Sequence, residues 1–158
     1  MRQRDAELLD LYLDSGPTAP DRLDFQDVVT YPRSPALVRK LLARGLDPNR
    51  PDWLGKTFLH ACAVNGARSV AAVILDAGAD INAREIDYQG TPLAAAVRAC
   101  GETDAKQANR GRRMVEFLIK RGAATNLPGD KPWATPLAWA ARHRLGAIVG
   151  LLRQHGAT

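Results

Sequence analysis

Hydrophobic positions recur at helical spacing in a series of short segments, and one stretch, residues 52–83, shows the pattern most completely. Its second half carries apolar residues at i, i+3, i+4 and i+7, namely Val70, Val73, Ile74 and Ala77, which predicts an amphipathic helix over about residues 69–77. A run of mostly small apolar residues precedes it, and Asn65-Gly66 separates the two segments. The stretch therefore predicts one helix–turn–helix unit with a short inner helix and an outer helix.

Copies of this unit appear on both sides. The opening Thr57-Phe58-Leu59 returns as Thr91-Pro92-Leu93 and as Thr135-Pro136-Leu137. Glycines that close predicted helices stand at positions 16, 45, 78, 122 and 156, with intervals of 29, 33, 44 and 34 residues. The long interval holds ten additional residues, about 101–110, which either lengthen the helices on both sides or form a loop. Without them the period is about 33 residues.

The beginning of the chain departs from this pattern. Residues 5–14 predict an amphipathic helix with a polar side suited to an end cap. A proline-rich loop follows, and then a short predicted helix over about residues 24–30. The next helix starts at Ser34, which is a good N-cap before Pro35, and Gly45 ends it.

A period of about 33 residues, a Thr-Pro-Leu opening and the exit phrase Gly78-Ala79-Asp80-Ile81-Asn82 together resemble the ankyrin repeat. The resemblance implies an all-α fold, an ankyrin-type solenoid of stacked helix-turn-helix repeats with short β-turn or hairpin fingers. The chain then reads as a single domain, residues 1–158, with five parts: a capping helix over 1–16, a degenerate repeat over 17–49, repeats over 50–83 and 84–126, the second with an inserted loop at about 101–110, and a C-terminal repeat over 127–158.

Some positions depart from the family pattern. Phe58 replaces the opening proline, and Ala94 and Ala138 replace the histidine that follows Leu. His60 matches that histidine, which forms hydrogen bonds within the repeat in the family. We therefore expect a structural role for His60, and neither a catalytic nor a metal-binding one.

Composition narrows the class of protein. The 158 residues are 46% hydrophobic and 25% charged, which is typical of a globular domain. No apolar run reaches the length of a membrane helix, and the N-terminus lacks a signal-peptide pattern, so we expect a cytoplasmic protein. Cys62 and Cys100 share no metal or redox spacing and are expected to be buried free thiols. No cofactor and no metal are expected.

The net charge of +5 is spread along the chain. This modest excess slightly favours a partner with an acidic surface. Nucleic-acid binding would need a concentrated basic stripe interleaved with aromatic residues, which the sequence lacks.

The resemblance also implies where a partner binds. In the family, the turns before the inner helices project as fingers and, with exposed inner-helix positions, form a concave protein-binding face. Carried onto this sequence, the candidate partner-binding residues are Trp53, Leu54, Lys56, Asn65, Tyr88, Gln89, Arg98, Trp133, Arg142 and His143. Aromatic residues beside arginines are typical of interface hot spots. The alternative is that Trp53 and Trp133 pack against neighbouring fingers.

The sequence thus predicts a non-catalytic protein–protein interaction module that acts as a monomer. A dedicated inhibitor or immunity protein, which neutralises a cognate toxin or enzyme, is the alternative. An enzyme is not expected, because the chain lacks a nucleophile motif, a phosphate-binding glycine loop and a carboxylate pair in a suitable context.

Overall fold

The computed structural model describes residues 34–101 and 104–158. This part of the chain holds seven helices and no strand, which confirms the predicted all-α class. In chain order they are α3 (Pro35–Ala43), α4 (Phe58–Asn65), α5 (Arg68–Asp76), α6 (Pro92–Ala99), α7 (Ala105–Lys120), α8 (Pro136–Arg142) and α9 (Gly146–Gln154). The predicted capping helix over 1–16, and residues 17–33 of the degenerate repeat, lie outside the described residues.

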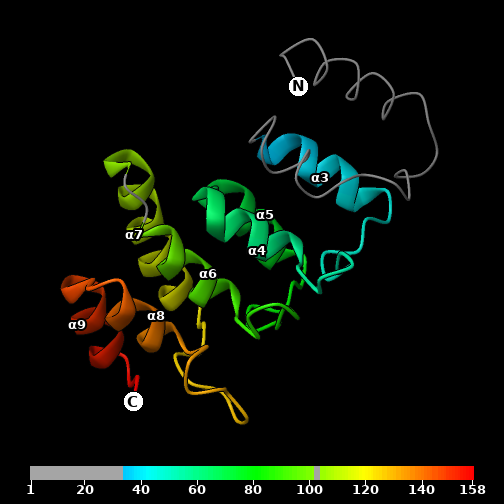
Figure 1. The fold of residues 1–158 in the computed structure, drawn as a ribbon. Coiled ribbons are helices and arrows are strands. Elements are labelled where there is room, and N and C mark those ends of the chain that lie inside the picture. The colour runs from blue at the N-terminus through cyan, green and yellow to red at the C-terminus, as the bar shows by residue number, and fades with distance from the viewer. Residues whose placement is uncertain (1–33, 102–103) are drawn as a thin grey trace.

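The helices form successive antiparallel pairs. Figure 1 shows α4 with α5, α6 with α7, and α8 with α9 stacked one after another, with the connecting loops on a common side. The inner helices α4, α6 and α8 pack on each other in that order. Each pair therefore buries its apolar stripe against its neighbours, as the repeat pattern predicts.

Threonine caps fix the start of each inner helix. The hydroxyls of Thr91 and Thr135 accept hydrogen bonds from the N–H groups of Ala94 (3.3 Å) and Ala138 (3.1 Å), and a proline occupies the first helical position in both. Such caps satisfy backbone donors that the first turn leaves unpaired. The same opening therefore sets the three inner helices in equivalent positions.

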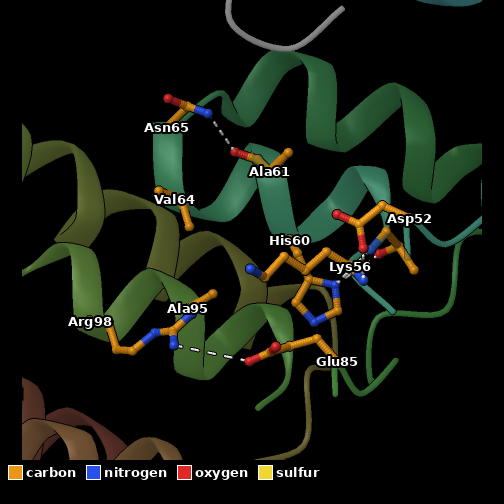
Figure 2. Close-up of a pocket in the computed structure, with 10 residues that line it drawn as sticks. Asp52, Lys56, His60, Ala61, Val64, Asn65, Glu85, Ala95 and Arg98 are labelled. Carbon is orange, nitrogen blue, oxygen red and sulfur yellow. Dashed lines mark hydrogen bonds and ion pairs between the residues drawn. The ribbon is translucent and has the colours of Figure 1, made fainter. Parts of the chain in front are cut away.

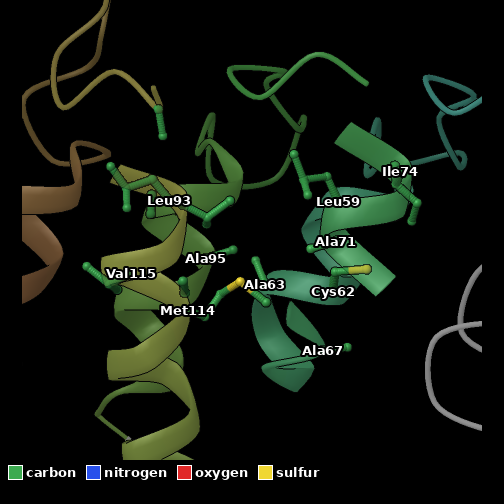
Figure 3. Packing of buried hydrophobic residues seen from close by; sticks show 14 of the residues in the cluster. Leu59, Cys62, Ala63, Ala67, Ala71, Ile74, Leu93, Ala95, Met114 and Val115 are labelled. Carbon is green, nitrogen blue, oxygen red and sulfur yellow. The ribbon is translucent and has the colours of Figure 1, made fainter. Parts of the chain in front are cut away.

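Small side chains allow the inner helices to approach closely. Ala63 and Ala95 lie in the core beside Leu59 and Leu93, and α7 contributes Met114 (Figure 3). Both leucines are fully buried, and removing such a side chain from water contributes about 1.5–3 kcal/mol. The apolar stripes predicted from the sequence are therefore the stripes that pack.

The ten-residue insertion lengthens an outer helix. Helix α7 has 16 residues, whereas α5 and α9 have 9 each. Residues 105–110 are therefore helical. A loop over 101–110 was one of the two structures that the sequence allowed. Gln107 donates a hydrogen bond to the carbonyl of Val64 at 2.6 Å. A Cβ placed on Gly66 would lie only 2.7 Å from the Cβ of Arg110. The added turns thus pack against the end of α4 in the preceding repeat.

Asparagines in the exit loops join successive repeats. The Asn49 amide donates to the carbonyl of Gly78 (3.0 Å), and its oxygen accepts from the N–H of Asp80 (2.6 Å). Asn126 repeats this pattern with Gly156 (2.7 Å) and Thr158 (3.2 Å). These bonds hold the exit loops of successive repeats in register. They thereby also align the turns that begin each following repeat.

Candidate protein-binding face

A carboxylate organises each of the three turns that precede the inner helices. Asp52 accepts from the N–H groups of Leu54 and Lys56, both at 2.8 Å. Glu85 accepts from those of Asp87 (3.0 Å) and Tyr88 (3.2 Å). In the last turn, Asp130 accepts from the N–H of Leu127 at 2.7 Å. Side chains that bond to nearby backbone N–H groups stabilise tight turns, so these fingers are preorganised.

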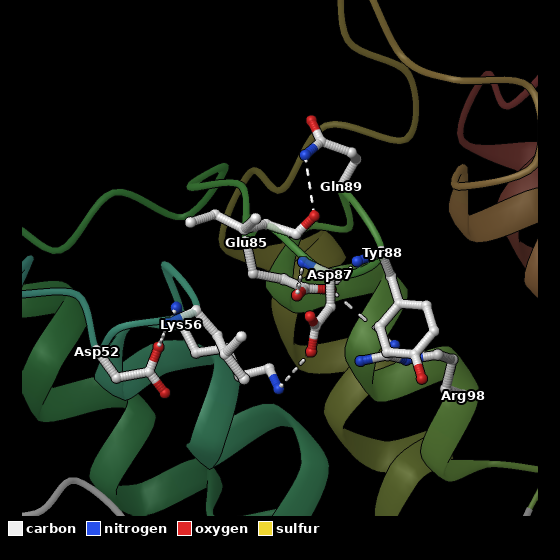
Figure 4. A network of polar contacts seen from close by, with 9 residues as sticks. Asp52, Lys56, Glu85, Asp87, Tyr88, Gln89 and Arg98 are labelled. Carbon is white, nitrogen blue, oxygen red and sulfur yellow. Dashed lines mark hydrogen bonds and ion pairs between the residues drawn. The ribbon is translucent and has the colours of Figure 1, made fainter.

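The first two turns are joined directly. The N–H of Ile86 donates to the carbonyl of Leu54 at 2.7 Å, and Lys56 pairs with Asp87 at 3.4 Å (Figure 4). Gly55 adopts a left-handed φ of 72° where Ile86 packs closely against it, a conformation that favours glycine. Leu54, a predicted contact residue, therefore also ties one finger to the next through its backbone.

The third turn is tied to the second repeat's exit. Arg84 donates to Asp130 at 2.6 Å and to the carbonyl of Pro128 at 2.9 Å. The three turns and the exposed sides of α4, α6 and α8 form one surface, which we call the inner face.

A group of aromatic and cationic side chains lies on the inner face between α6 and α8. The guanidinium carbon of Arg98 lies 4.3 Å from the Tyr88 ring centroid and 5.3 Å from that of Trp139. Arg142 approaches Trp139 to 4.7 Å, and His143 stacks on it with centroids 5.9 Å apart. Tyr88 meets Trp139 edge to face at 5.7 Å. These five residues are called the Trp139 cluster below.

A buried carboxylate supports this cluster. Glu85 is 1% exposed, and its Oε1 lies 4.0 Å from Nη1 of Arg98. Buried charges are costly unless they are paired or hydrogen-bonded, and Glu85 has two backbone donors as well as the arginine. The Glu85 carboxylate therefore positions the turn that holds Tyr88. It also positions the Arg98 side chain, which stacks on the Tyr88 ring (Figure 4).

Between α4 and α6 the inner face contains a pocket of about 260 Å³ (Figure 2). Ala61, Val64 and Ala95 give it apolar walls, and polar side chains complete the lining, namely Asp52, Lys56, Thr57, His60, Asn65, Glu85 and Arg98. Its size suits a single side chain of a bound partner. Arg98 belongs to both the pocket and the Trp139 cluster, so the two are continuous.

His60 has a structural role in this pocket. Its Nδ1 accepts from the N–H of Thr57 at 3.1 Å, which places the proton on Nε2, 3.2 Å from the carbonyl of Gly90. Burial lowers the pKa of His60 from its ordinary 6.5 to about 4. The neutral ring thus joins its own helix to the next turn, as the family resemblance implies.

The structure separates the predicted contact residues into groups. Tyr88, Arg98, Arg142 and His143 meet around Trp139. Lys56 and Asn65 line the pocket with Arg98. Gln89 has a left-handed φ of 52° and donates to the carbonyl of Ile86, so it shapes its turn as well as standing exposed.

Trp53 and Trp133 lie apart from both groups. Trp53 is 85% exposed and Trp133 is 44% exposed. Within the described residues, no hydrogen bond or ring contact links either one to the pocket or the Trp139 cluster. The alternative that Trp53 packs against a neighbouring finger does not fit, because its side chain lies almost wholly in solvent.

Trp139 was absent from the predicted contact residues, although it is the centre of the cluster. It is 8% exposed, and its indole N–H is buried without a partner among the described residues. Counting from the threonine that opens each inner helix, Trp139 occupies the position of Ala61 and Ala95. A tryptophan where other repeats carry alanine was the signal that could have identified it.

Burial raises the pKa of the Cys62 thiol to about 12 and that of Cys100 to about 11; both cysteines are unbridged and buried. Residues 34–101 and 104–158 contain no helix long and apolar enough to cross a membrane.

Comparison with known protein families finds a match for one repeat of the chain. Residues 54–86 match the model of the ankyrin repeat. The match covers the unit that the sequence pattern singled out, and the flanking helix pairs repeat its geometry. The resemblance to the ankyrin repeat is thus confirmed for residues 54–86.

Among curated proteins, the mouse NF-kappa-B inhibitor delta is 29% identical over 136 residues, which is 79% of this chain and 42% of that protein. The palmitoyltransferase Hip14 of Drosophila melanogaster is 36% identical over 52% of this chain and 14% of its own length. The rice potassium channel KOR2 is 39% identical over 36% of this chain and 8% of its own length. The chain thus spans less than half the length of these relatives.

Proposed function

We propose that this protein is a non-catalytic binding module that engages a partner protein through its inner face. Ankyrin repeats generally mediate protein–protein interaction. We further propose that it acts as a single chain in the cytoplasm. The partner would lie across the three turns and the exposed sides of α4, α6 and α8.

The Trp139 cluster is the observation that carries this proposal. Tyrosine, tryptophan and arginine are the residue types that contribute most binding energy in protein interfaces. Here they are already held in place by Glu85 and by one another, so little side-chain entropy remains to be lost on binding. A pocket sized for one side chain adjoins them, and Trp53 adds an 85% exposed indole in the first turn.

A dedicated inhibitor is the second candidate. The observation that favours it is the likeness to a protein named as an inhibitor, the mouse NF-kappa-B inhibitor delta. An inhibitor would use the same inner face and differ only in its effect on the partner. The distinction is therefore made by measuring the partner's activity in the complex.

An affinity capture tests the binding face. Wild-type protein and the variant Trp53→Ala/Trp133→Ala/Arg142→Ala are immobilised, and proteins from a lysate of the source cells are compared by mass spectrometry. We expect a specific partner that the variant loses, because the removed side chains are exposed and supply the hot-spot contacts.

The control carries Arg113→Ala/Lys120→Ala/Arg153→Ala, three exposed positions on the outer helices α7 and α9. It should retain the partner. Equal retention by both triple variants would show that the inner face is not the binding site. If the captured partner is an enzyme and loses activity in the complex, the inhibitor is favoured over the adaptor.

A further inference from the structure

Two arginines converge on one tryptophan in the Trp139 cluster. The guanidinium carbons of Arg98 and Arg142 lie 5.3 Å and 4.7 Å from the same ring centroid, so one short segment of a partner can reach both. Stacking on aromatic rings fixes the plane of a guanidinium and leaves its N–H edges for bidentate contacts. The two side chains are therefore prepared to bind a planar anion.

The local charges leave this pair of arginines incompletely neutralised. Glu85 is the carboxylate next to Arg98, at 4.0 Å, and it is also engaged by two backbone N–H groups. Among the described residues, no carboxylate lies within ion-pairing distance of Arg142. His143 stacks on the same indole. The cluster thus presents a positive site on an otherwise mixed surface.

We propose that Arg98 and Arg142 form a clamp for a carboxylate side chain in an acidic segment of the partner protein. This inference rests on the proposed function, because it names the chemistry that the inner face recognises. A polyanion such as nucleic acid fits less well, since Asp52, Glu85 and Asp87 on the same face would repel its backbone. A single carboxylate placed between the arginines avoids that repulsion.

The adjoining pocket adds a second requirement to the segment. Arg98 lines both sites, so a chain that crosses the clamp also passes over the hollow formed by Ala61, Val64 and Ala95. An apolar side chain fits those walls. The recognised segment therefore has an acidic residue close to an apolar one.

A displayed library of random twelve-residue peptides tests the clamp. Selection is run on the wild-type chain, on Arg142→Gln, and on the control Arg153→Gln, which makes the same change at an exposed position of α9. Arg142 is chosen because it is exposed, whereas loss of Arg98 would leave Glu85 buried and unpaired. Arg98→Lys serves as the milder second variant, since it keeps the charge and removes the stacked plane.

We expect peptides selected on the wild type and on the control to be enriched in Asp or Glu. A synthetic selected peptide should bind Arg142→Gln about tenfold more weakly, as loss of a charge-assisted bond implies. Changing its acidic residue to the amide should weaken binding to the wild type by a similar factor and have little effect on Arg142→Gln. That non-additivity is the signature of a direct contact.

Other outcomes separate the two proposals. Peptides that need Tyr88 or the pocket but show no acidic preference would overturn the clamp and leave the binding face intact. A peptide that binds only when its acidic residue is replaced by phosphoserine would also overturn it, since the site would then select phosphate. Selected peptides that bind equally to wild type, Arg142→Gln and a Tyr88→Ala/Val64→Gln variant would contradict the inner face itself.

Discussion

The two halves of the inner face differ most clearly at one repeat position. Between α4 and α6 that position is Ala61 and then Ala95, and the space beside them is a pocket of about 260 Å³. At α8 the position is Trp139, which is buried under stacked cations. The helices and their caps are alike, so the side chain at one position decides whether the surface is hollow or filled.

A second position divides the repeats differently. His60 joins the Thr57 turn to Gly90 in the first half, whereas Ala94 and Ala138 stand at its place in the next two repeats. The exposed inner-helix position changes from Val64 to Arg98 and Arg142. The repeat framework is therefore shared, and recognition depends on the few positions that the framework does not constrain.

The largest expected effect concerns the core of each half. Leu59 is fully buried inside the stack, whereas Leu137 at the same repeat position is half-buried in the last described repeat. Leu59→Ala should lower the free energy of unfolding by about 3–5 kcal/mol, because a cavity remains, and Leu137→Ala by roughly half as much. Urea denaturation of the two variants measures both. Equal losses would mean that the two halves are equally enclosed.

Acid should destabilise the first half through His60. The unfolded chain protonates this ring near its ordinary pKa of 6.5, and the folded protein only near 4. The unfolded state therefore binds more protons in this range, and stability present above pH 6.5 is lost as the pH falls toward 4, by roughly 3 kcal/mol in total.

The measurement is urea denaturation at pH 7, 5.5 and 4.5 on wild type and His60→Gln. The variant should be less stable at pH 7 and should lose less stability than the wild type between pH 7 and 4.5. His143→Gln is the matched control, since that histidine is exposed. A wild-type pH dependence that survives unchanged in His60→Gln would assign the acid effect to other groups.

Filling the hollow should make the first half resemble the second. Ala61→Leu places a larger side chain in the pocket, on a residue that is only half-buried, so the fold should tolerate it. Partner affinity should drop about tenfold, or roughly 1.4 kcal/mol. Calorimetric titration with the captured partner checks this, with Ala147→Leu on α9 as the control. Unchanged affinity would show that the pocket stays empty in the complex.

The smallest effect concerns the ends of the inner helices. Gly66 follows α4 and Arg144 follows α8, with left-handed φ values of 64° and 56°. Such a conformation strains a residue with a Cβ. Arg144→Gly should therefore stabilise the protein by about 0.5–1 kcal/mol, while Gly66→Ala should destabilise it. A thermal unfolding midpoint that falls for Arg144→Gly would contradict this.

Much of the fold follows from local sequence signals. The threonine openings, the closing glycines and the apolar stripes predicted the helix pairs, because each signal acts within one turn of its own helix. The sequence did not predict where α7 begins, because residues 101–110 carry no apolar stripe at helical spacing. What holds residues 105–110 helical is the packing of Gly111 on Cys100 and of Gln107 on Val64, which are tertiary contacts.

The candidate site was less predictable. The family pattern indicated the exposed positions, including Arg98 and Arg142, but not that both would stack on Trp139. The sequence analysis also missed Glu85. This residue organises its turn from a buried position, and a charged side chain is seldom expected to be buried. Whether the predicted contact residues bind a partner stays a prediction.

Hydrogen exchange of the captured complex tests the central claim most directly. The account predicts slower exchange on binding in the three turns, at 52–56, 85–90 and 127–133, and in the inner helices α4, α6 and α8, with no change in the outer helices α5, α7 and α9. Protection confined to the outer helices, with the inner face exchanging as in the unbound protein, would contradict it.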